Sequence, residues 1–378
     1  MTVVHLVPAM EQGGVETVVC DLSRALVEAG HRSIVISKGG RLVERLRADG
    51  AEHFALDLKS KNPLTALWRA WRLRRLLRRL DVTGSLIVLA HSRVPAWLYV
   101  LARWRSGGGQ GRDGHLTDSG AIRFLTFAHG ANSVSRYSEV MTKGELVLVP
   151  SKFLAEYLKA NYRFDYSKIR VLHPAVDEHR FDPAKLDTEF VASLRRAWHL
   201  QPSTSNLQPP TSNLLLAVGR VTPVKGYDTL IRDFAAGKYP YAKLVIVGGA
   251  DKHHREYLAE LKRQAAASGA DIVFAGRQEK IPECLSLADA VISANTTKPE
   301  SFGLSVVEAY AMNKPVLAKR FGGVAEILAE VEAYRAAKPE SGWRDAAIAL
   351  YGFKRFTAEA LSILQASVGE PASVKDNL

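Results

Sequence analysis

Short apolar runs alternate with helix-like segments twice along this chain, and this alternation constrains the fold more than any other feature. The runs that suit buried strands lie at 3–7, 33–37, 51–58, 85–90, 124–128 and 146–150, and again at 214–218, 244–247, 272–274, 290–293 and 316–318. Segments with helical spacing, such as Val15 to Leu26, separate many of them. Strands that alternate with helices predict α/β domains with parallel, doubly wound sheets.

The two series are separated near residues 173–213. We therefore expect two Rossmann-like domains facing one cleft, with ligands at the carboxyl ends of the strands. The length of 378 residues agrees with two or three domains of about 100–200 residues each. Two stretches are expected to be unstructured insertions, the glycine-rich segment 106–120 and the polar, proline-containing segment 201–213.

The composition is that of an ordinary soluble protein, 47% hydrophobic and 24% charged. Two cysteines, Cys20 and Cys284, are too few for a disulfide framework or a four-ligand zinc site. No apolar run reaches the roughly 18 residues that a membrane span needs. The N-terminus lacks the pattern of a secretory signal, so we expect a cytoplasmic protein.

The net charge of +12 is concentrated in one stretch, 68–105, which has nine arginines and a single acid, Asp81. A basic surface of this kind suits nucleic acid or an anionic membrane. Nucleic-acid binding is the weaker interpretation, because the arginines gather on one amphipathic helix and no nucleic-acid module is recognisable.

Segment 64–80 carries two apolar stripes on opposite faces of one helix, at about 100° per residue. We call them the Trp stripe (Leu64, Leu67, Trp68, Trp71) and the Leu stripe (Leu73, Leu76, Leu77, Leu80). A straight helix cannot bury both in one core. Because tryptophan and arginine suit a membrane interface, we expect Leu64–Leu80 to bind an anionic membrane surface. The alternative is that a bent helix, or the aromatic segment Trp97–Trp104, buries both stripes.

One loop between a predicted strand and a predicted helix holds Gly219-Arg220 and Lys225-Gly226. Glycine lets the backbone approach a ligand, and a helix N-terminus favours an anion. Arg220 can hold phosphate through two hydrogen bonds, and Lys225 adds a point charge. We interpret the loop as a diphosphate clamp, although its spacing is not that of a P-loop. The alternative is an ordinary solvated loop.

A second loop reads Pro299-Glu300-Ser301-Phe302-Gly303-Leu304, and Glu308 follows about one turn into the next helix. Gly303 would expose backbone N–H groups to an anion. The carboxylates of Glu300 and Glu308 would accept hydrogen bonds from the vicinal hydroxyls of a sugar and a ribose. The alternative is that both are first-turn acids favoured by the helix dipole.

Two weaker signals lie in the first half. His129, beside Gly130, follows the predicted strand 124–128 and is placed to reach a cleft, although a lone histidine is more often structural. Gly13-Gly14 follows the first strand and can bring backbone close to a ligand, but it lacks the dinucleotide fingerprint.

In this order, with Val149-Pro150-Ser151 and Val171…Val176-Asp177 between them, the motifs resemble the retaining nucleotide-sugar glycosyltransferases of the GT-B fold, specifically family 4, over residues 3 to 326. The resemblance implies an acceptor-side domain at 1–173 and a nucleotide-sugar-binding domain at 174–354. It also implies a C-terminal helix, about 355–370, that packs back on the first domain.

The resemblance implies transfer of a hexose from a nucleotide diphosphate sugar, with a UDP-sugar favoured, to a saccharide acceptor with retention of configuration. The acceptor would be a lipid-linked bacterial surface glycan, such as a lipopolysaccharide, O-antigen or capsule intermediate. The enzyme would lie peripherally on the cytoplasmic face of the inner membrane. In the family the leaving diphosphate is thought to help deprotonate the acceptor, so no protein nucleophile is needed.

The same resemblance assigns roles to matching residues. Arg220 and Lys225 would neutralise the diphosphate, Glu308 would hold the ribose, and Glu300 and His129 would face the donor sugar. The remaining donor-binding positions would be Gly14, Gly219, Phe302, Gly303 and Leu304. Because no Asp-x-Asp metal motif is present, we expect neither a metal nor another cofactor.

The sequence departs from the family at two places. The usual Pro-Asn-Gly-Val-Asp segment reads His173-Pro174-Ala175-Val176-Asp177, and residues 327–350 have a helical pattern where a glycine-containing strand segment is usual. Two enzymatic alternatives of the same fold are a nucleotide-sugar epimerase and a hydrolase. An inactive scaffold is disfavoured, because Arg220, Lys225, Glu300 and Glu308 are all present.

Overall fold

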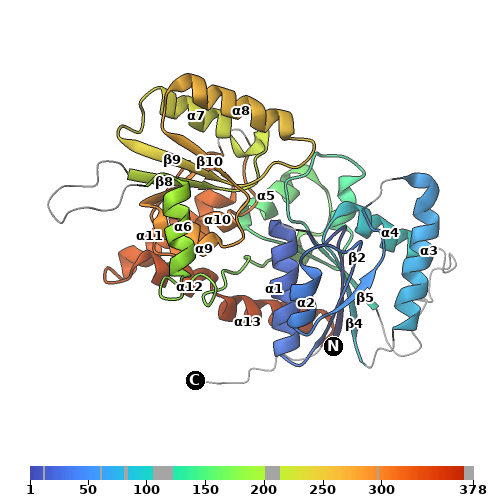
Figure 1. Cartoon of the computed structure of the whole chain (residues 1–378). Helices are drawn as coiled ribbons and strands as arrows, with labels where there is room; N and C mark the ends of the chain where they lie inside the picture. The colour runs from blue at the N-terminus through green and yellow to red at the C-terminus, as the bar shows by residue number, and fades with distance from the viewer. Residues whose placement is uncertain are drawn as a thin grey trace. The chain divides into compact units, whose positions relative to one another are not determined.

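The computed structural model describes residues 1–11, 13–59, 62–80, 84–104, 122–200, 213–295 and 298–369. The two expected insertions, 106–120 and 201–213, lie outside these residues except for Asn213. The chain divides into two compact units, Met1–Ala175 together with the C-terminal segment from Lys354, and Val176–Phe353 (Figure 1).

The first unit contains a seven-stranded sheet in the order β3-β2-β1-β4-β5-β6-β7. All of its strand pairs are parallel, which confirms the α/β prediction. The strands are β1 (Thr2–Leu6), β2 (Arg32–Ser37), β3 (Glu52–Ala55), β4 (Leu86–Ala90), β5 (Ile122–Phe127), β6 (Leu146–Val149) and β7 (Ile169–Val171). The sequence analysis missed β7, because three residues with Arg170 at the centre give too short an apolar signal.

Helices cover both faces of this sheet. The helices of this unit are α1 (Gly14–Glu28), α2 (Val43–Ala48), α3 (Pro63–Arg79), α4 (Arg93–Trp104), α5 (Lys152–Asn161) and, from Lys354 on, α13 (Phe353–Ser367), with 3-10 turns η1 (Ser138–Thr142) and η2 (Tyr166–Lys168). Side chains of α3, α4 and α5 share a core with Val4, Leu6 and Ile34. Side chains of α1 and α2 pack with Val35, whose side chain points to the opposite face of β2.

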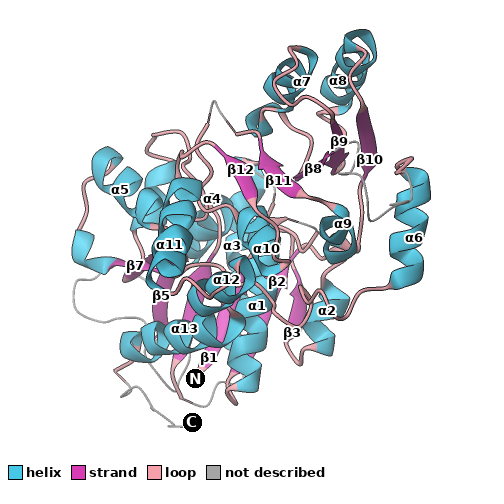
Figure 2. Cartoon of the chain, turned by 90° about the vertical axis from the view of Figure 1, so that its left-hand side faces the viewer, coloured by secondary structure: helices cyan, strands magenta, loops and turns pink. Residues whose placement is uncertain are grey.

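The second unit contains a five-stranded parallel sheet in the order β10-β9-β8-β11-β12, whose strands lie side by side in Figure 2. The strands are β8 (Asn213–Val218), β9 (Ala242–Val247), β10 (Ile272–Gly276), β11 (Ala290–Ser293) and β12 (Val316–Ala318). The helices are α6 (Thr188–Ala197), η3 (Pro223–Lys225), α7 (Tyr227–Ala235), α8 (Arg255–Ser268), α9 (Ile281–Leu287), α10 (Leu304–Ala311), α11 (Gly323–Ala337) and α12 (Trp343–Tyr351).

Alternate residues of β8 enter two different cores. Leu215 packs with α7 and α8, whereas Leu214 and Leu216 pack with α6, α9, α10, α11 and α12. This is the alternation expected of a strand that is buried on both faces. The segment 327–350 is helical as the sequence predicted, but a turn divides it between α11 and α12.

Helix α3 runs unbroken from Pro63 to Arg79, and Asn62 caps it by accepting a hydrogen bond from the Leu64 N–H at 2.9 Å. The Leu stripe joins the core, with Leu73 and Leu77 fully buried. The Trp stripe is exposed, at 54% for Trp68, 48% for Trp71 and 88% for Leu64. The alternative that both stripes are buried is therefore wrong.

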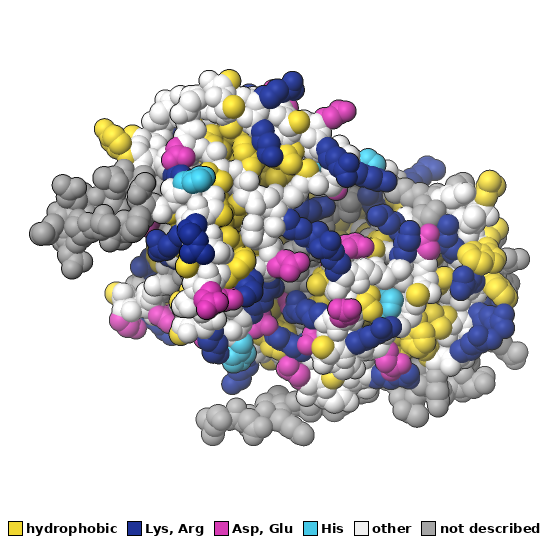
Figure 3. Space-filling model, in the orientation of Figure 1, with side chains coloured by type: hydrophobic (Ala, Val, Ile, Leu, Met, Phe, Trp, Pro, Cys, Tyr) yellow, Lys and Arg dark blue, Asp and Glu magenta, His cyan; other side chains and the backbone are white. Residues whose placement is uncertain are grey.

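Basic side chains accompany the exposed stripe. The Arg72 guanidinium lies 4.9 Å from the centre of the Trp68 ring, and that of Arg75 lies 5.4 Å from the Trp71 ring. Figure 3 shows yellow and dark blue side chains next to one another on the right, over the part of the first unit that carries α3. Of the helices that the structure describes, none combines the length and the apolar character needed to cross a bilayer.

Candidate functional site

In the sheet of the second unit, the order in which successive strands are added reverses at β8 and β11. These two strands are neighbours in the sheet although β9 and β10 lie between them in sequence. In open α/β sheets, ligands bind beyond the carboxyl ends of the strands at such a switch point. The loop after β8 carries Gly219, Arg220 and Lys225, and the segment after β11 carries Glu300. Topology therefore brings the two predicted motifs to one edge of one sheet.

The loop after β8 is tightly held. The buried Tyr227 hydroxyl donates a hydrogen bond to the Gly219 carbonyl oxygen at 3.0 Å. Burial, with the nearby Glu300 carboxylate, raises the pKa of Tyr227 above its usual range. Gly248, after β9, lies so close that a Cβ there would be 1.8 Å from the Gly219 carbonyl oxygen. The packing thus fixes the backbone from which Arg220 and Lys225 extend.

Lys225 and Glu300 form an ion pair between Nζ and Oε1. The Asn295 side-chain amide also donates to Glu300 Oε1, at 2.5 Å. Both partners of the pair keep some contact with solvent, at 28% exposure for Lys225 and 15% for Glu300. The site therefore places an ammonium group and a carboxylate within reach of a bound ligand.

Asn295 is a site residue that the sequence analysis missed. It is buried, and its Oδ1 atom has no hydrogen-bond partner among the described residues. Its position two residues beyond the end of β11 is the signal that could have identified it, because polar side chains at the carboxyl end of a strand face the ligand edge.

The segment from Glu300 to Glu308 is anchored by backbone contacts. The Gly323 N–H donates to the Glu300 carbonyl oxygen at 2.8 Å. Gly303 precedes α10 with a φ of 122°, a conformation that favours glycine. Glu308 lies in the second turn of α10 and is half-buried.

Phe302 is a core residue, and its ring meets that of Tyr351 edge to face at 5.6 Å. Leu304 is partly buried against the same core. Because the side chains at these two positions point into the core, a ligand would contact their backbone atoms. Arg220 differs from its neighbours because its side chain is exposed and forms no ion pair with a described residue.

The first unit has its own switch point, between β1 and β4. Gly14 is the first residue of α1, which follows the loop beyond β1, and a Cβ there would have no described neighbour within 4 Å. His129 lies two residues beyond β5, with its ring stacked on Phe127 at 4.1 Å between centroids. The sequence analysis missed two further histidines, His5 on β1 and His91 just after β4, which share this edge of the sheet with His129.

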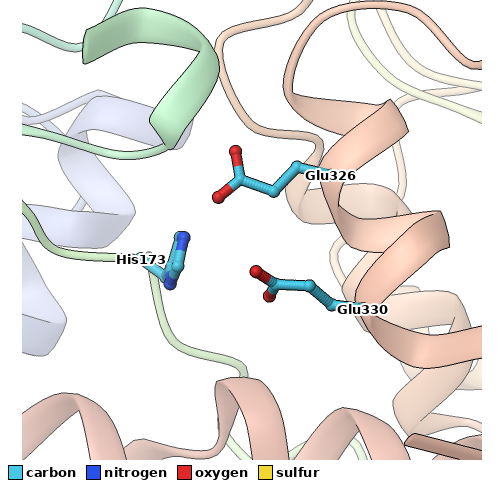
Figure 4. Close-up of side chains that lie close together, drawn as sticks. All are labelled: His173, Glu326 and Glu330. Carbon is cyan, nitrogen blue, oxygen red and sulfur yellow. The ribbon is translucent and has the colours of Figure 1, made fainter. Parts of the chain in front are cut away.

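Figure 4 shows Glu326 and Glu330 projecting from α11. They lie on one face of the helix because they are one turn apart. His173, the third residue labelled there, lies after β7 in the first unit. Glu326 lies in the first turn of α11, which begins at Gly323.

Two family models match the chain. The one described as Glycosyltransferase Family 4 matches residues 12–180, and the one described as Glycosyl transferases group 1 matches residues 203–348. Together the two matches take in most of both units.

A curated relative, D-inositol 3-phosphate glycosyltransferase from Mycolicibacterium smegmatis, is 30% identical over 196 residues, which are 51% of this chain. The match covers only 41% of that relative's length. A glycosyltransferase from Rickettsia africae superposes with a TM-score of 0.77 at 25% identity, covering 98% of this chain and 99% of that one. Anabaena HepE, solved with UDP and glucose, gives a TM-score of 0.73 at 17% identity, covering 97% of this chain and 100% of that one. The HepE likeness shows the fold alone.

Proposed function

This chain belongs to glycosyltransferase family 4 and has the GT-B fold, and we propose that it transfers a hexose from a nucleotide diphosphate sugar to a saccharide acceptor with retention of configuration. The observation that carries the proposal is the group of Lys225, Glu300 and Asn295 at the β8/β11 switch point. That group offers a cation for phosphate and hydrogen-bonding groups for sugar hydroxyls in one place.

The site suits a donor that carries both phosphate and hydroxyl groups. Lys225 and the exposed Arg220 would hold the diphosphate, since charge-assisted hydrogen bonds to phosphate are strong. Once Lys225 binds phosphate, Glu300 is released to accept hydrogen bonds from the sugar. Glu308 on α10 would hold the ribose, and the backbone of Phe302, Gly303 and Leu304 would face the phosphates at the start of that helix.

In the proposed reaction the bond between the anomeric carbon and the β-phosphate oxygen breaks, and a bond to an acceptor oxygen forms on the same face of the sugar. Negative charge develops on the diphosphate as its bond to the anomeric carbon breaks, and the acceptor proton passes to the departing phosphate oxygen. Positioned cations lower the energy of such a transition state. Lys225 and Arg220 supply this charge, and we propose that the transfer needs no metal and is insensitive to EDTA.

UDP-sugars are the first donors to test, because HepE was solved with UDP and glucose. Each nucleotide sugar is added to the purified protein, and the shift in melting temperature is measured. A ligand that binds the native state at 100 times its Kd adds about 2.7 kcal/mol to the free energy of unfolding. If no nucleotide sugar shifts the melting temperature or supports transfer, the proposal is wrong.

The donor incubated alone distinguishes the alternatives. A hydrolase would release free sugar, and an epimerase would convert the donor into its isomer, whereas a transferase leaves it largely intact until an acceptor is added. The anomeric configuration of the product, measured by NMR, then tests retention.

We further propose that the acceptor is a lipid-linked surface glycan of the lipopolysaccharide, O-antigen or capsule type, met at a membrane surface. The exposed Trp stripe and the arginines beside it support this, because α3 contains no acidic residue and tryptophan favours the interface. Anionic lipid attracts each nearby Lys or Arg by about 1 kcal/mol. This arrangement would hold the protein on the cytoplasmic face of the inner membrane.

A further inference from the structure

Three histidines form a continuous hydrogen-bonded chain at the ligand edge of the first sheet. His5 Nδ1 lies 3.0 Å from His91 Nε2, and His91 Nδ1 lies 2.9 Å from His129 Nε2. They come from β1 and from the segments after β4 and β5, three adjacent strands on both sides of the switch point. The sequence motif alone identified only His129.

All three rings are neutral near pH 7. Burial lowers the pKa of His5 and of His129 to about 3. It lowers the pKa of His91 as well, and the neighbouring rings of His129 and His5 add to the effect. A neutral imidazole carries one N–H and one lone pair, so each ring in the chain can donate once and accept once.

Two arrangements of protons satisfy both hydrogen bonds. In the first, every ring carries its proton on Nδ1, so His5 donates to His91 and His91 donates to His129. In the second, every ring carries its proton on Nε2 and the direction is reversed. Any mixture of the two sets leaves two lone pairs or two protons facing each other, and one hydrogen bond is lost.

His5 Nε2 decides between the two arrangements. This atom is buried and has no hydrogen-bond partner among the described residues. The second arrangement would place an N–H there without an acceptor, and buried N–H groups without a partner are rarer than unsatisfied acceptors. The first arrangement leaves only a lone pair at His5 Nε2, so it is favoured.

We propose that His5 and His91 are positioning residues that hold His129 in the Nδ1–H form, so that His129 donates a hydrogen bond to an oxygen of the donor sugar and does not act as a base. His129 Nε2 is occupied by His91, and Nδ1 makes no hydrogen bond to a described residue. The stacked Phe127 ring fixes the plane of the imidazole. That a sugar oxygen accepts this hydrogen bond rests on the proposed function, but the tautomer of His129 does not.

Neutral partners suit this role better than a carboxylate would. A carboxylate beside His91 would favour a positively charged imidazole. A histidine neighbour instead transmits the direction of the hydrogen bonds without adding charge. The three hydrogen-bonded histidines thus keep a proton on His129 Nδ1 as a fixed hydrogen-bond donor, and they place no proton acceptor beside the reacting sugar.

Nitrogen-15 NMR of the histidine-labelled protein without substrate tests the tautomer directly. The resonances of His129 are assigned by their loss in His129→Gln. We expect a protonated Nδ1 and an unprotonated Nε2 for His129 near pH 7. A protonated Nε2, or an imidazolium, would overturn the proposal whether or not the protein transfers sugar.

Kinetics test the two positioning residues. His5→Leu removes the first donor in the chain, and His5→Asn returns an N–H near the position of Nδ1. We expect His5→Leu to lower kcat about tenfold with a smaller change in the donor KM, and His5→Asn to restore most of it. The exposed His179 gives the control variant His179→Gln. Equal loss in the Leu and Asn variants would contradict the proposal, and if His5→Leu fails to fold, the wild-type NMR result still decides it.

Discussion

The Lys225 ammonium contacts the Glu300 carboxylate, although 75 residues separate the two in the chain. Each residue comes from a loop beyond one of two adjacent strands, and Asn295 holds the same carboxylate from a third position. A ligand with a diphosphate next to a sugar could replace this ion pair with two separate sets of contacts.

Replacing Lys225 with alanine should lower kcat/KM for the donor by about 10–100-fold, because a hydrogen bond to a charged group contributes about 1.5–3 kcal/mol. The fold should survive, since Lys225 lies in a partly exposed turn. Initial rates at limiting donor measure the effect. Lys238→Ala removes an exposed lysine from the same unit as the control. Near-normal transfer by Lys225→Ala would refute the clamp.

Glu308→Gln and Glu300→Gln should have different effects. If Glu308 holds the ribose, its variant should bind the bare nucleoside diphosphate and the nucleotide sugar more weakly, to a similar extent. If Glu300 faces the sugar, its variant should bind the nucleoside diphosphate almost normally while transfer slows and sugars are distinguished less well. Calorimetric titration with both ligands measures the difference. Equal losses of nucleoside diphosphate affinity would contradict the two roles.

Gly14→Ala should separate stability from activity. Among the residues that the structure describes, a Cβ at this position meets nothing within 4 Å, and alanine stabilises helical positions by about 0.5–1 kcal/mol relative to glycine. We therefore expect an unchanged or slightly higher melting temperature. Transfer should nevertheless fall if the donor lies against the Gly14 backbone. Full activity in the variant would remove Gly14 from the donor site.

The Trp stripe should bind anionic membranes. The protein should float with liposomes that contain anionic lipid at low salt, and much less at high salt or with neutral lipid, because salt screens the attraction. Trp68→Ala with Trp71→Ala should reduce flotation while donor binding persists.

Leu317→Ala is a matched control for this experiment, since Leu317 is an exposed apolar residue of the second unit, 44% accessible. If the wild-type protein ignores anionic liposomes, a soluble acceptor becomes the better proposal.

The histidine chain should make stability depend on pH. The pKa of His5 and of His129 is about 3 in the folded protein, below the ordinary value of 6.5. The unfolded chain therefore binds more protons between these values. The contribution of these two histidines to the free energy of unfolding is fully present above pH 6.5. It is lost as the pH falls from 6.5 toward 3, by about 1.4 kcal/mol per pH unit for each histidine.

Urea unfolding at pH 7 and at pH 5.5 measures this loss. His5→Asn should make the loss of stability smaller by the share of one histidine. The control His179→Gln leaves the three hydrogen-bonded histidines unchanged and should lose as much stability as the wild type. An identical pH dependence in the wild type and in His5→Asn would contradict the assignment.

Much of the fold followed from local patterns. The apolar runs at 290–293 and 316–318 coincide with β11 and β12, and the run at 33–37 lies within β2. Buried parallel strands are apolar along their whole length, so each leaves a signal in its own few residues. The strand β7 was missed because its three residues, with Arg170 at the centre, leave no such signal, and the helix α6 was also missed.

The site was only partly visible in the sequence. Glycines and charged residues in the loops after strands marked Gly219, Lys225, Glu300 and His129, because loops at the carboxyl ends of parallel strands meet at one edge. Asn295, His5 and His91 stand in no such motif. His5 lies inside an apolar strand, where a single polar residue gives no sign of what it contacts.

The sequence by itself determined most of the strand and helix series and the two opposed stripes of α3, and it supplied the hypothesis of which residues bind a phosphate and a sugar. Only the tertiary structure decided that the Leu stripe is buried and the Trp stripe exposed, that Lys225 meets Glu300, and that His5, His91 and His129 form one chain. The physical reason is the separation in sequence over which each effect acts. Periodicity and turn chemistry act between residues a few positions apart, whereas burial and hydrogen bonding between strands depend on which elements pack side by side.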